Sequence, residues 1–322
     1  HLFCLGTAHD DATELAKRVA TSVTEQLDSV EAWARAILAR RIEVLCYPEI
    51  GMHALTFQLA TLRLAPIQFT SWGHPESSGL RTMDYFLSAE LLEPDDAKLN
   101  YREQLIKLPN LGCHYTPESV RPLPLDLASL GIDANAPILL CPGTPFKYVP
   151  ARDHVLVEIA RQLDTAQFVF FTHKHNWLSE KLAKRLNSTF AAAGLKYDNH
   201  VRFIPWQPKE AFYGLLGQAT VFLDSLGFSG FNTAMQALDC QLPVVTCAGR
   251  FMRGRLASGL LRRMQLDELV AMNEAEYIAL AIRLCKDSHY RETIQAEISR
   301  RKNTLFLDAE PVRALERFCL ET

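Results

Sequence analysis

The sequence ATVFLDSLGFSGFNTAMQALDCQLPVVTCAG, residues 219–249, indicates the class of fold. Residues 220–224 form a short apolar run of β-branched and aromatic side chains, which predicts a strand. A loop containing Gly227 and Gly230 follows, then a predicted helix over residues 234–240 and a second strand over residues 244–247. A strand–helix–strand unit of this kind predicts two parallel strands joined by a right-handed connection.

The loop between the first strand and the helix has the features of an anion-binding site. Ligands of parallel sheets bind beyond the carboxyl ends of the strands. Asn232 and Thr233, which we expect to cap the helix, place polar groups beside its free amides, and Gly230 lets a ligand approach the backbone closely. A diphosphate would suit this loop. An ordinary capped turn has the same pattern, so the loop alone does not decide between the two.

The composition limits the class of protein. The chain has 322 residues, enough for two domains, with 48% hydrophobic and 22% charged residues, as in ordinary globular proteins. A net charge of −3 gives no reason to expect nucleic acid or an acidic membrane surface as the partner. The sequence contains no apolar run long enough to span a bilayer. We expect a fragment of a longer protein, because the chain starts at His1 directly in a predicted strand.

The eight cysteines are scattered and form no C-x-x-C pair. Cys46, Cys141 and Cys247 lie in or beside apolar runs. We therefore expect buried thiols in a reducing, cytoplasmic compartment rather than disulfides or a zinc site.

Strands and helices alternate along the chain, which predicts an α/β fold with parallel sheets. A segment rich in proline and glycine, residues 109–137, is the best linker. We predict domains over residues 1–115 and 116–310 and a terminal helix over 311–322, with a ligand cleft between the domains. In the first domain we expect strands at 2–5, 42–47, 67–72, 85–89 and 104–108, and helices at 12–26, 30–40 and 54–62. In the second we expect strands at 138–141, 167–172, 201–204, 220–224 and 244–247, and helices at 151–163, 178–193, 209–217, 234–240, 255–264, 274–285 and near 287–302.

Short motifs along nearly the whole chain carry a family resemblance. The first domain contains Ala65-Pro66-Ile67-Gln68, Trp72-Gly73-His74-Pro75, Ser77-Ser78-Gly79 and Met83-Asp84-Tyr85. The second contains Phe146-Lys147, Phe203-Ile204-Pro205, Pro208-Lys209-Glu210, Asn232-Thr233, and Gly249 followed by residues 253–261. In this order they resemble the catalytic core of the O-GlcNAc transferases, the SPINDLY-like proteins and the bacterial adhesin N-glucosyltransferases.

The resemblance implies a GT-B fold, in which two Rossmann-like domains with parallel sheets face each other across a cleft. The first domain would be the acceptor side, truncated at its start, and the second would hold the nucleotide-sugar. The implied reaction is inverting transfer from a UDP-sugar, of GlcNAc or a hexose, to a Ser, Thr or Asn side chain of a protein or peptide. No metal or other cofactor is implied. The sequence agrees with a metal-independent reaction, because Asp84 and Asp224 stand alone at strand ends and no D-x-D pair occurs near a strand end.

The resemblance makes Lys147 and His74 the candidate catalytic residues. Lys147 follows the strand at 138–141, and its charge would stabilise the leaving diphosphate. His74 follows the strand at 67–72, where it could accept a proton or bind a sugar hydroxyl. Glu49 is a weaker candidate in the same domain. A solvated lysine and a structural loop histidine are the plain alternatives.

A further set of residues would bind the nucleotide-sugar: Gly73, Gln207, Lys209, Phe212, Gly230, Phe231, Asn232, Thr233, Gln236 and Arg255. Phe212 would stack on the base, unless it is a core residue of its helix. Gln236 stands where the animal enzymes have an acidic residue for the ribose. Arg255, like Arg253, could reach the diphosphate or lie on the surface.

The loop that carries Phe228 and Phe231 would lie over the sugar. An aromatic ring there would exclude an N-acetyl group by steric clash, which favours UDP-glucose or another unsubstituted hexose over UDP-GlcNAc. Either phenylalanine could instead turn into the core.

Two other functions are compatible with parts of the sequence. Gly227-Phe228-Ser229-Gly230-Phe231 lies where α/β-hydrolases place G-x-S-x-G, although the last glycine is missing. A non-catalytic module that binds a nucleotide-sugar or a protein is the other alternative, and Gln236 favours it.

Overall fold

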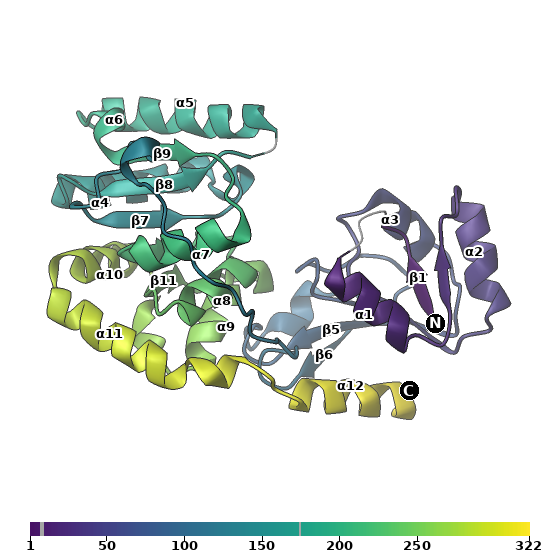
Figure 1. The fold of residues 1–322 in the computed structure, drawn as a ribbon. Coiled ribbons are helices and arrows are strands. Elements are labelled where there is room, and N and C mark those ends of the chain that lie inside the picture. Colours follow the sequence, from purple (N-terminus) through teal and green to yellow (C-terminus); the bar gives the residue numbers. More distant parts are fainter. Residues whose placement is uncertain (7–9, 174) are drawn as a thin grey trace. The chain divides into compact units, whose positions relative to one another are not determined.

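The computed structural model describes residues 1–6, 10–173 and 175–322, which divide into two compact units (Figure 1). The first contains His1–Glu90, Asp95–Leu108 and Arg313–Thr322, and the second contains Leu91–Pro94 and Pro109–Val312. The division therefore falls a few residues from the expected boundaries after residues 115 and 310. The start of the linker joins the second unit, where the Asn110 side chain accepts a hydrogen bond from Arg263 at 2.7 Å and donates one to Asp308 at 2.8 Å.

The described residues of the first unit form two parallel sheets. One pairs β1 (Leu2–Cys4) with β2 (Val23–Glu25), and the other has β3 (Val44–Tyr47), β4 (Ile67–Ser71), β5 (Tyr85–Ala89) and β6 (Gln104–Leu108) in chain order. Its helices are α1 (Asp11–Val19), α2 (Val30–Ala39), α3 (Ala54–Ala60) and most of α12 (Glu310–Glu321). The core beside β3 includes Trp33, Leu59 and Ala60, each at most 1% exposed.

The helix predicted over residues 12–26 is wrong in its second half. Asp10 caps α1 by accepting a hydrogen bond from the Thr13 amide at 2.8 Å. The helix ends at Val19 because Ala20 is extended, and the β-branched Val23 and Thr24 then pair with β1.

The last helix belongs to the first unit. The Phe318 ring of α12 makes edge-on contacts with Phe69 of β4, at a centroid distance of 5.5 Å, and with Tyr85 of β5, at 5.1 Å. Ala314 and Leu315 pack against the same small apolar cluster. Burial of this apolar face holds the end of the chain on the four-stranded sheet.

The second unit is built on one six-stranded parallel sheet in the order β12-β11-β10-β7-β8-β9. Its strands are β7 (Ile138–Cys141), β8 (Gln167–Phe171), β9 (Val201–Ile204), β10 (Val221–Leu223), β11 (Val244–Cys247) and β12 (Val270–Ala271). The predicted parallel pairing of β10 with β11 is confirmed. Strand β12 was not predicted, because it has only two residues.

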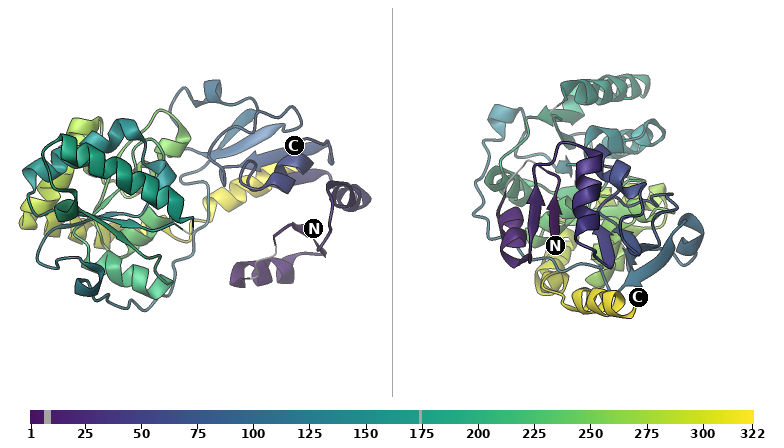
Figure 2. Two further views of the ribbon diagram at one scale, coloured as in Figure 1. Left: turned by 90° about the horizontal axis from the view of Figure 1, so that it is seen from above. Right: turned by 90° about the vertical axis from the view of Figure 1, so that its right-hand side faces the viewer.

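Helices flank this sheet (Figure 2). They are α4 (Asp153–Gln162), α5 (Asn176–Ala192), α6 (Tyr197–His200), α7 (Lys209–Gln218), α8 (Asn232–Asp239), α9 (Leu256–Arg263), α10 (Glu274–Lys286) and α11 (Ser288–Arg301). Helix α4 contacts α5 and α10, whereas α8 contacts α7 and α9, so the helices form two groups. Single 3-10 turns lie at Ala97–Asn100, Ala128–Leu130, Pro145–Lys147, Pro150–Arg152, Met252–Gly254, Asp267–Leu269 and Lys302–Leu305.

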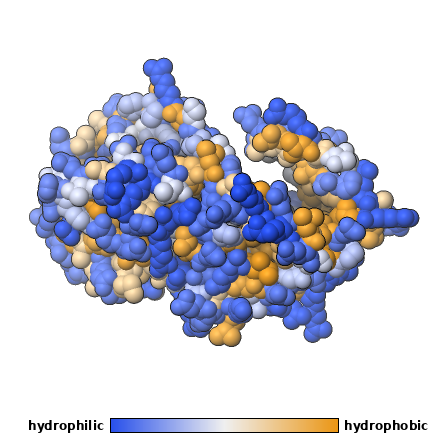
Figure 3. Space-filling view, turned by 90° about the horizontal axis from the view of Figure 1, so that it is seen from below, coloured by the Kyte–Doolittle hydropathy of each residue, from blue (hydrophilic) through white to orange (hydrophobic). Residues whose placement is uncertain are grey.

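The surface is mixed in character. The face drawn in Figure 3 is mostly hydrophilic, with apolar side chains in separate patches. In the described ranges, no helix is both long and apolar enough to cross a membrane. All eight cysteines are free thiols. Cys141 is buried as expected. Cys46 is exposed, because alternate residues of β3 point to opposite faces, and Cys247, the last residue of β11, is half-buried.

Substitution of two glycines of α7, Gly214 and Gly217, tests how closely this helix packs in the second unit. A Cβ on Gly214 would lie 1.9 Å from the Leu123 carbonyl oxygen, whereas a Cβ on Gly217 would meet nothing within 4 Å. We expect Gly214→Ala to lower the free energy of unfolding by about 1–3 kcal/mol, because the backbone must move. Gly217→Ala should raise it by about 0.5–1 kcal/mol through helix propensity. Chemical denaturation of both variants measures this, and equal effects would contradict the close approach of α7 to Leu123.

Candidate functional site

The helix after the glycine loop starts earlier than predicted. α8 begins at Asn232, so Asn232 and Thr233 are its first two residues and Phe231 holds the N-cap position. The expectation that Asn232 and Thr233 cap the helix is therefore wrong, because both already have helical backbone. Their amides are among the first-turn donors that an α-helix leaves without an intrahelical partner. A Cβ on Gly230 would lie 2.8 Å from Thr233 Oγ1, so only glycine fits this turn without a shift.

A buried carboxylate anchors the glycine loop. Asp224, directly after β10, is 4% exposed. Its Oδ1 accepts a hydrogen bond from the Gly230 amide at 2.8 Å, and its Oδ2 accepts bonds from Ser229 Oγ at 2.6 Å and Thr246 Oγ1 at 2.7 Å. Burial raises the pKa of Asp224, and these hydrogen bonds act in the opposite direction.

Lys147 lies against the same loop. It ends the 3-10 turn Pro145–Lys147 after β7, and its Nζ donates a hydrogen bond to the Ser229 carbonyl oxygen at 3.1 Å. The ammonium is 4.4 Å from the centre of the Phe228 ring, a cation–π contact. Burial lowers the pKa of Lys147, and the charge of Asp224 opposes that shift. The structure therefore brings the predicted Lys147 to the loop that opens α8.

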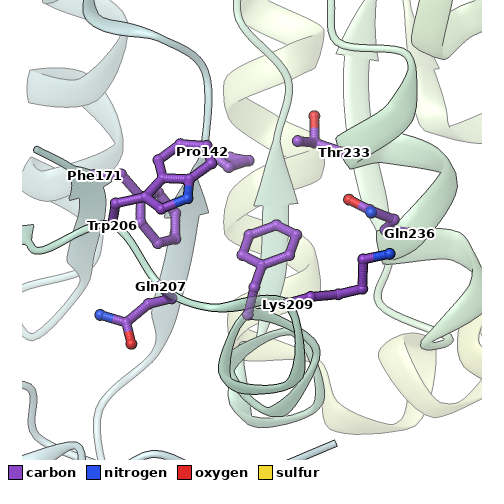
Figure 4. A pocket seen from close by; sticks show the side chains of 8 residues that line it. Pro142, Phe171, Trp206, Gln207, Lys209, Thr233 and Gln236 are labelled. Atoms are coloured by element: carbon purple, nitrogen blue, oxygen red, sulfur yellow. The ribbon is translucent and has the colours of Figure 1, made fainter. Parts of the chain in front are cut away.

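A pocket of about 220 Å³ lies beside this loop (Figure 4). It is lined by five predicted residues, Gln207, Lys209, Phe212, Thr233 and Gln236, and by three that were not predicted, Pro142, Phe171 and Trp206. The side chains of Lys209 and Gln236 extend toward each other across one end of the pocket (Figure 4). The Lys209 ammonium also forms an ion pair with Glu118 at 3.1 Å. Aromatic walls and polar groups at one end suit a planar, partly polar ligand.

The aromatic wall has one member that sequence reasoning missed. Trp206 is 70% exposed, and its ring makes an edge contact with Phe171 at 6.1 Å. An aromatic residue between Pro205 and Pro208, just past a strand end, was the available signal. Phe212 is half-buried and lies 5.7 Å from Phe171, so it lines the pocket and is not enclosed in the core.

Arg253 and Arg255, which follow β11, make hydrogen bonds in this region. Arg255 Nη1 donates to the Gly249 carbonyl at 3.1 Å, and the Arg253 carbonyl accepts a hydrogen bond from the Ser229 amide at 2.7 Å. Phe231, at the other end of the loop, is half-buried with its ring 6.4 Å from Tyr115. Arg255 and Phe231 are thus neighbours of the loop, and their contact with a ligand stays a prediction.

The remaining predicted residues, Gly73 and His74, belong to the first unit. A Cβ on Gly73 would lie 2.5 Å from the Pro48 carbonyl oxygen, and one on Gly51 would lie 3.0 Å from the His74 ring. The two glycines therefore allow the loops after β3 and β4 to pack closely, with the half-buried imidazole between them. Glu49 accepts a hydrogen bond from the Met52 amide at 2.8 Å.

The geometry of Ser229 argues against the hydrolase alternative. Ser229 is 0% exposed, and its hydroxyl donates to Asp224 and accepts from the Ala257 amide at 2.8 Å. A nucleophilic serine must be exposed and bonded to a general base. Ser229 instead serves as a buried link within the loop.

Residues 177–311 match the model of glycosyl transferase family 41. The chain is 26% identical over 260 residues to the Arabidopsis thaliana "Probable UDP-N-acetylglucosamine--peptide N-acetylglucosaminyltransferase SPINDLY", a match that covers 78% of the chain and 27% of that protein. Within residues 177–311, this chain is similar to glycosyl transferase family 41.

The chain is also similar to the "UDP-glucose:protein N-beta-glucosyltransferase" of Actinobacillus pleuropneumoniae serotype 7 (strain AP76). It is 25% identical over 272 residues, which cover 80% of the chain and 41% of that protein. The chain thus spans about a quarter of the SPINDLY relative and less than half of the bacterial one.

Solved structures show the fold. A mutant of the Thermobaculum terrenum O-GlcNAc transferase matches 98% of the chain and 60% of its own, with a TM-score of 0.84 at 21% identity. The Thermosynechococcus elongatus sucrose-phosphate synthase matches 90% of the chain and 76% of its own, with a TM-score of 0.60 at 16% identity. The predicted GT-B class, with parallel sheets in two α/β units, is confirmed for this chain.

The aromatic wall provides a test of the pocket. We expect Trp206→Ala to weaken binding of UDP about tenfold, because an exposed ring beside a base contributes stacking energy. Trp177→Ala is the matched control: Trp177 is 61% exposed on α5 and does not line the pocket. Calorimetric titration measures both. Equal affinity in the two variants would show that UDP does not use this wall.

Proposed function

We propose that this chain is the core of an inverting, metal-independent glycosyltransferase that moves a sugar from a UDP-sugar to a protein side chain. The observation that carries the proposal is the Lys147 ammonium, held 3.1 Å from the Ser229 carbonyl at the loop that opens α8. Two matched relatives are named as transferases of GlcNAc to peptide and of glucose to protein. Because the chain covers only part of them, its own activity is inferred from the site.

The proposed donor site runs from the aromatic pocket to the start of α8. The base would lie against Trp206 and Phe212, and the ribose would hydrogen-bond to Gln236 at the polar end of the pocket. The diphosphate would then reach the first-turn amides of α8, which attract anions. Lys147 would approach from the other side of the loop.

The chemical step needs charge stabilisation on the leaving group. As the bond to the sugar breaks, negative charge grows on the diphosphate, and a preorganised ammonium stabilises it more strongly there than in the ground state. Among the residues that the structure describes, no three His, Cys, Asp or Glu side chains form a group that could hold a metal ion. We assign this stabilisation to the Lys147 ammonium and the first-turn amides of α8.

The acceptor side is assigned to the first unit. His74 lies on the loop after β4, with its ring packed over Gly51. In that position it would accept a proton from the acceptor or bind a sugar hydroxyl. Inversion follows if the acceptor attacks the anomeric carbon from the side opposite the diphosphate.

Removing the lysine tests the proposal. We expect Lys147→Ala to lower the turnover number by roughly two to three orders of magnitude, the effect of losing one preorganised charge donor. Lys184→Ala, at an exposed position of α5, is the control and should retain wild-type turnover. Transfer to an acceptor protein is measured with and without EDTA, and EDTA should have no effect.

Two outcomes would contradict this proposal. Unchanged turnover in Lys147→Ala would remove the site assignment, and activity lost in EDTA but restored by Mn²⁺ would remove metal independence. If UDP binds but no donor among UDP-GlcNAc, UDP-glucose, UDP-galactose and GDP-fucose is turned over, the non-catalytic binding module becomes the better account. The amide of Gln236, in place of a carboxylate, favours that second candidate.

Donor choice depends on the loop before α8. The Phe228 ring lies 6.2 Å from the Phe146 ring and beside the Lys147 ammonium, so it stands next to the proposed diphosphate site. We expect the wild-type chain to prefer UDP-glucose to UDP-GlcNAc, because a rigid ring leaves no room for the acetamide.

Shortening that ring should change the preference. Phe228→Ala should raise kcat/KM for UDP-GlcNAc relative to UDP-glucose by about tenfold, of the order expected for removing a steric exclusion. Phe231→Ala is the matched variant on the same loop and shows which ring is responsible. Equal use of both donors by the wild-type chain would reject the steric argument.

A further inference from the structure

Asp224 is a buried carboxylate to which the proposed mechanism gives no direct part. It is almost fully enclosed, yet it is surrounded by neutral hydrogen-bond donors: the Gly230 amide and the hydroxyls of Ser229 and Thr246. Burying a carboxylate is costly unless its charge and lone pairs are satisfied. Its position is also fixed through the backbone, because the Asp224 carbonyl accepts a hydrogen bond from the Tyr277 hydroxyl at 2.9 Å.

Asp224 is linked to Lys147 through a single residue, Ser229. Ser229 is held at three points: its hydroxyl by Asp224 and the Ala257 amide, and its own amide by the Arg253 carbonyl. Its carbonyl then accepts the hydrogen bond from the Lys147 ammonium. A shift of the Asp224 carboxylate would therefore move the atom that orients Lys147.

The same loop also fixes the ring beside the ammonium. Ser225 Oγ donates to the Phe228 carbonyl at 2.7 Å, so the residues from Asp224 to Gly230 form a closed turn. Lys147 touches this turn twice, at the Ser229 carbonyl and at the Phe228 ring.

The charge of Asp224 also links this carboxylate to Lys147. A small cavity beside Lys147 is lined by the titratable groups Cys141, Tyr148, Arg152, Asp153, Asp224 and Tyr277. Asp153 is already paired with Arg185 at 2.6 Å. Of the two carboxylates there, Asp224 is thus the one whose charge acts on the ammonium.

We propose that Asp224 is a positioning residue for Lys147, because its carboxylate fixes the turn at residues 229–230 whose carbonyl holds the Lys147 ammonium toward the diphosphate of the ligand. This inference rests on the proposed function only in assigning the diphosphate to Lys147. On this inference Asp224 affects the binding of the diphosphate through Lys147 and does not contact the nucleoside.

A double-mutant cycle on ligand binding tests the inference. Wild type, Asp224→Asn, Lys147→Ala and the double variant are titrated with UDP and, separately, with uridine, which lacks the phosphates. Asp224→Asn should weaken UDP about tenfold, comparable to the loss of a hydrogen bond to a charged group, and leave uridine within about twofold. In the Lys147→Ala background the same change should cost less than about twofold, because the group it positions is gone.

A matched pair covers the case in which Asp224→Asn does not fold. Ser229→Ala and Thr246→Val each remove one hydroxyl from the same carboxylate oxygen, but only Ser229 lies on the loop. Ser229→Ala should weaken UDP several-fold, and Thr246→Val should leave UDP affinity within about twofold even where it lowers the melting temperature.

The outcomes separate this inference from the proposed function. Additive losses of UDP affinity in the cycle, or equal losses for UDP and uridine, would overturn the positioning role and leave the transferase proposal standing. UDP binding with the predicted coupling but without sugar transfer would support the positioning role and overturn the transferase proposal.

Discussion

The structure depends on carboxylates buried at the ends of parallel strands. Asp224 follows β10 in the second unit and gathers the glycine loop around itself. Glu103, directly before β6 in the first unit, is 5% exposed and accepts hydrogen bonds from Ser77 Oγ at 2.7 Å and the Ser78 amide at 2.8 Å. In both units the loop held in this way carries proposed site residues, Gly230 and Phe231 in one and Gly73 and His74 in the other.

This arrangement suits catalysis of a charged leaving group. Donors contribute most when they are already oriented, since turning them during the reaction costs free energy. The loop before α8 is held by hydrogen bonds within the protein. Its Gly230 and Ser229 amides donate to Asp224 and to the Arg253 carbonyl, and its Phe228 carbonyl accepts from the Ser225 hydroxyl. Lys147 is then held against that loop by one hydrogen bond and one ring contact. The aromatic pocket beside it would supply binding energy remote from the reacting atoms, which transferases use to orient their donors.

Much of this fold could be predicted because several of its strands are short runs of mostly buried residues. The strands Tyr85–Ala89, Ile138–Cys141 and Val244–Cys247 have the expected bounds, since each is a compact apolar run. Prediction failed where local pattern and tertiary pairing disagree. Residues 23–25 continue a helical pattern but pair with β1, and β12 is too short to show a period.

Sequence motifs point to several residues that line the candidate site, but not to the hydrogen-bond network that joins them. Lys147 and five pocket residues come from motifs, whereas Trp206 was missed because it lies in an irregular segment between prolines. Asp224 looked like a lone acid at a strand end. Its hydrogen-bond partners include Thr246, on the next strand, and Ser229, which in turn accepts a hydrogen bond from the Ala257 amide; a sequence pattern does not reveal such distant partners.

The most direct measurement is a crystal structure of the chain soaked with UDP. The account predicts the base between Trp206 and Phe212, the diphosphate at the amides of Asn232 and Thr233, and the Lys147 ammonium within hydrogen-bond distance of a phosphate oxygen, with the loop at residues 225–230 unchanged. UDP bound away from Lys147, or a loop that must rearrange around a displaced Asp224, would contradict it.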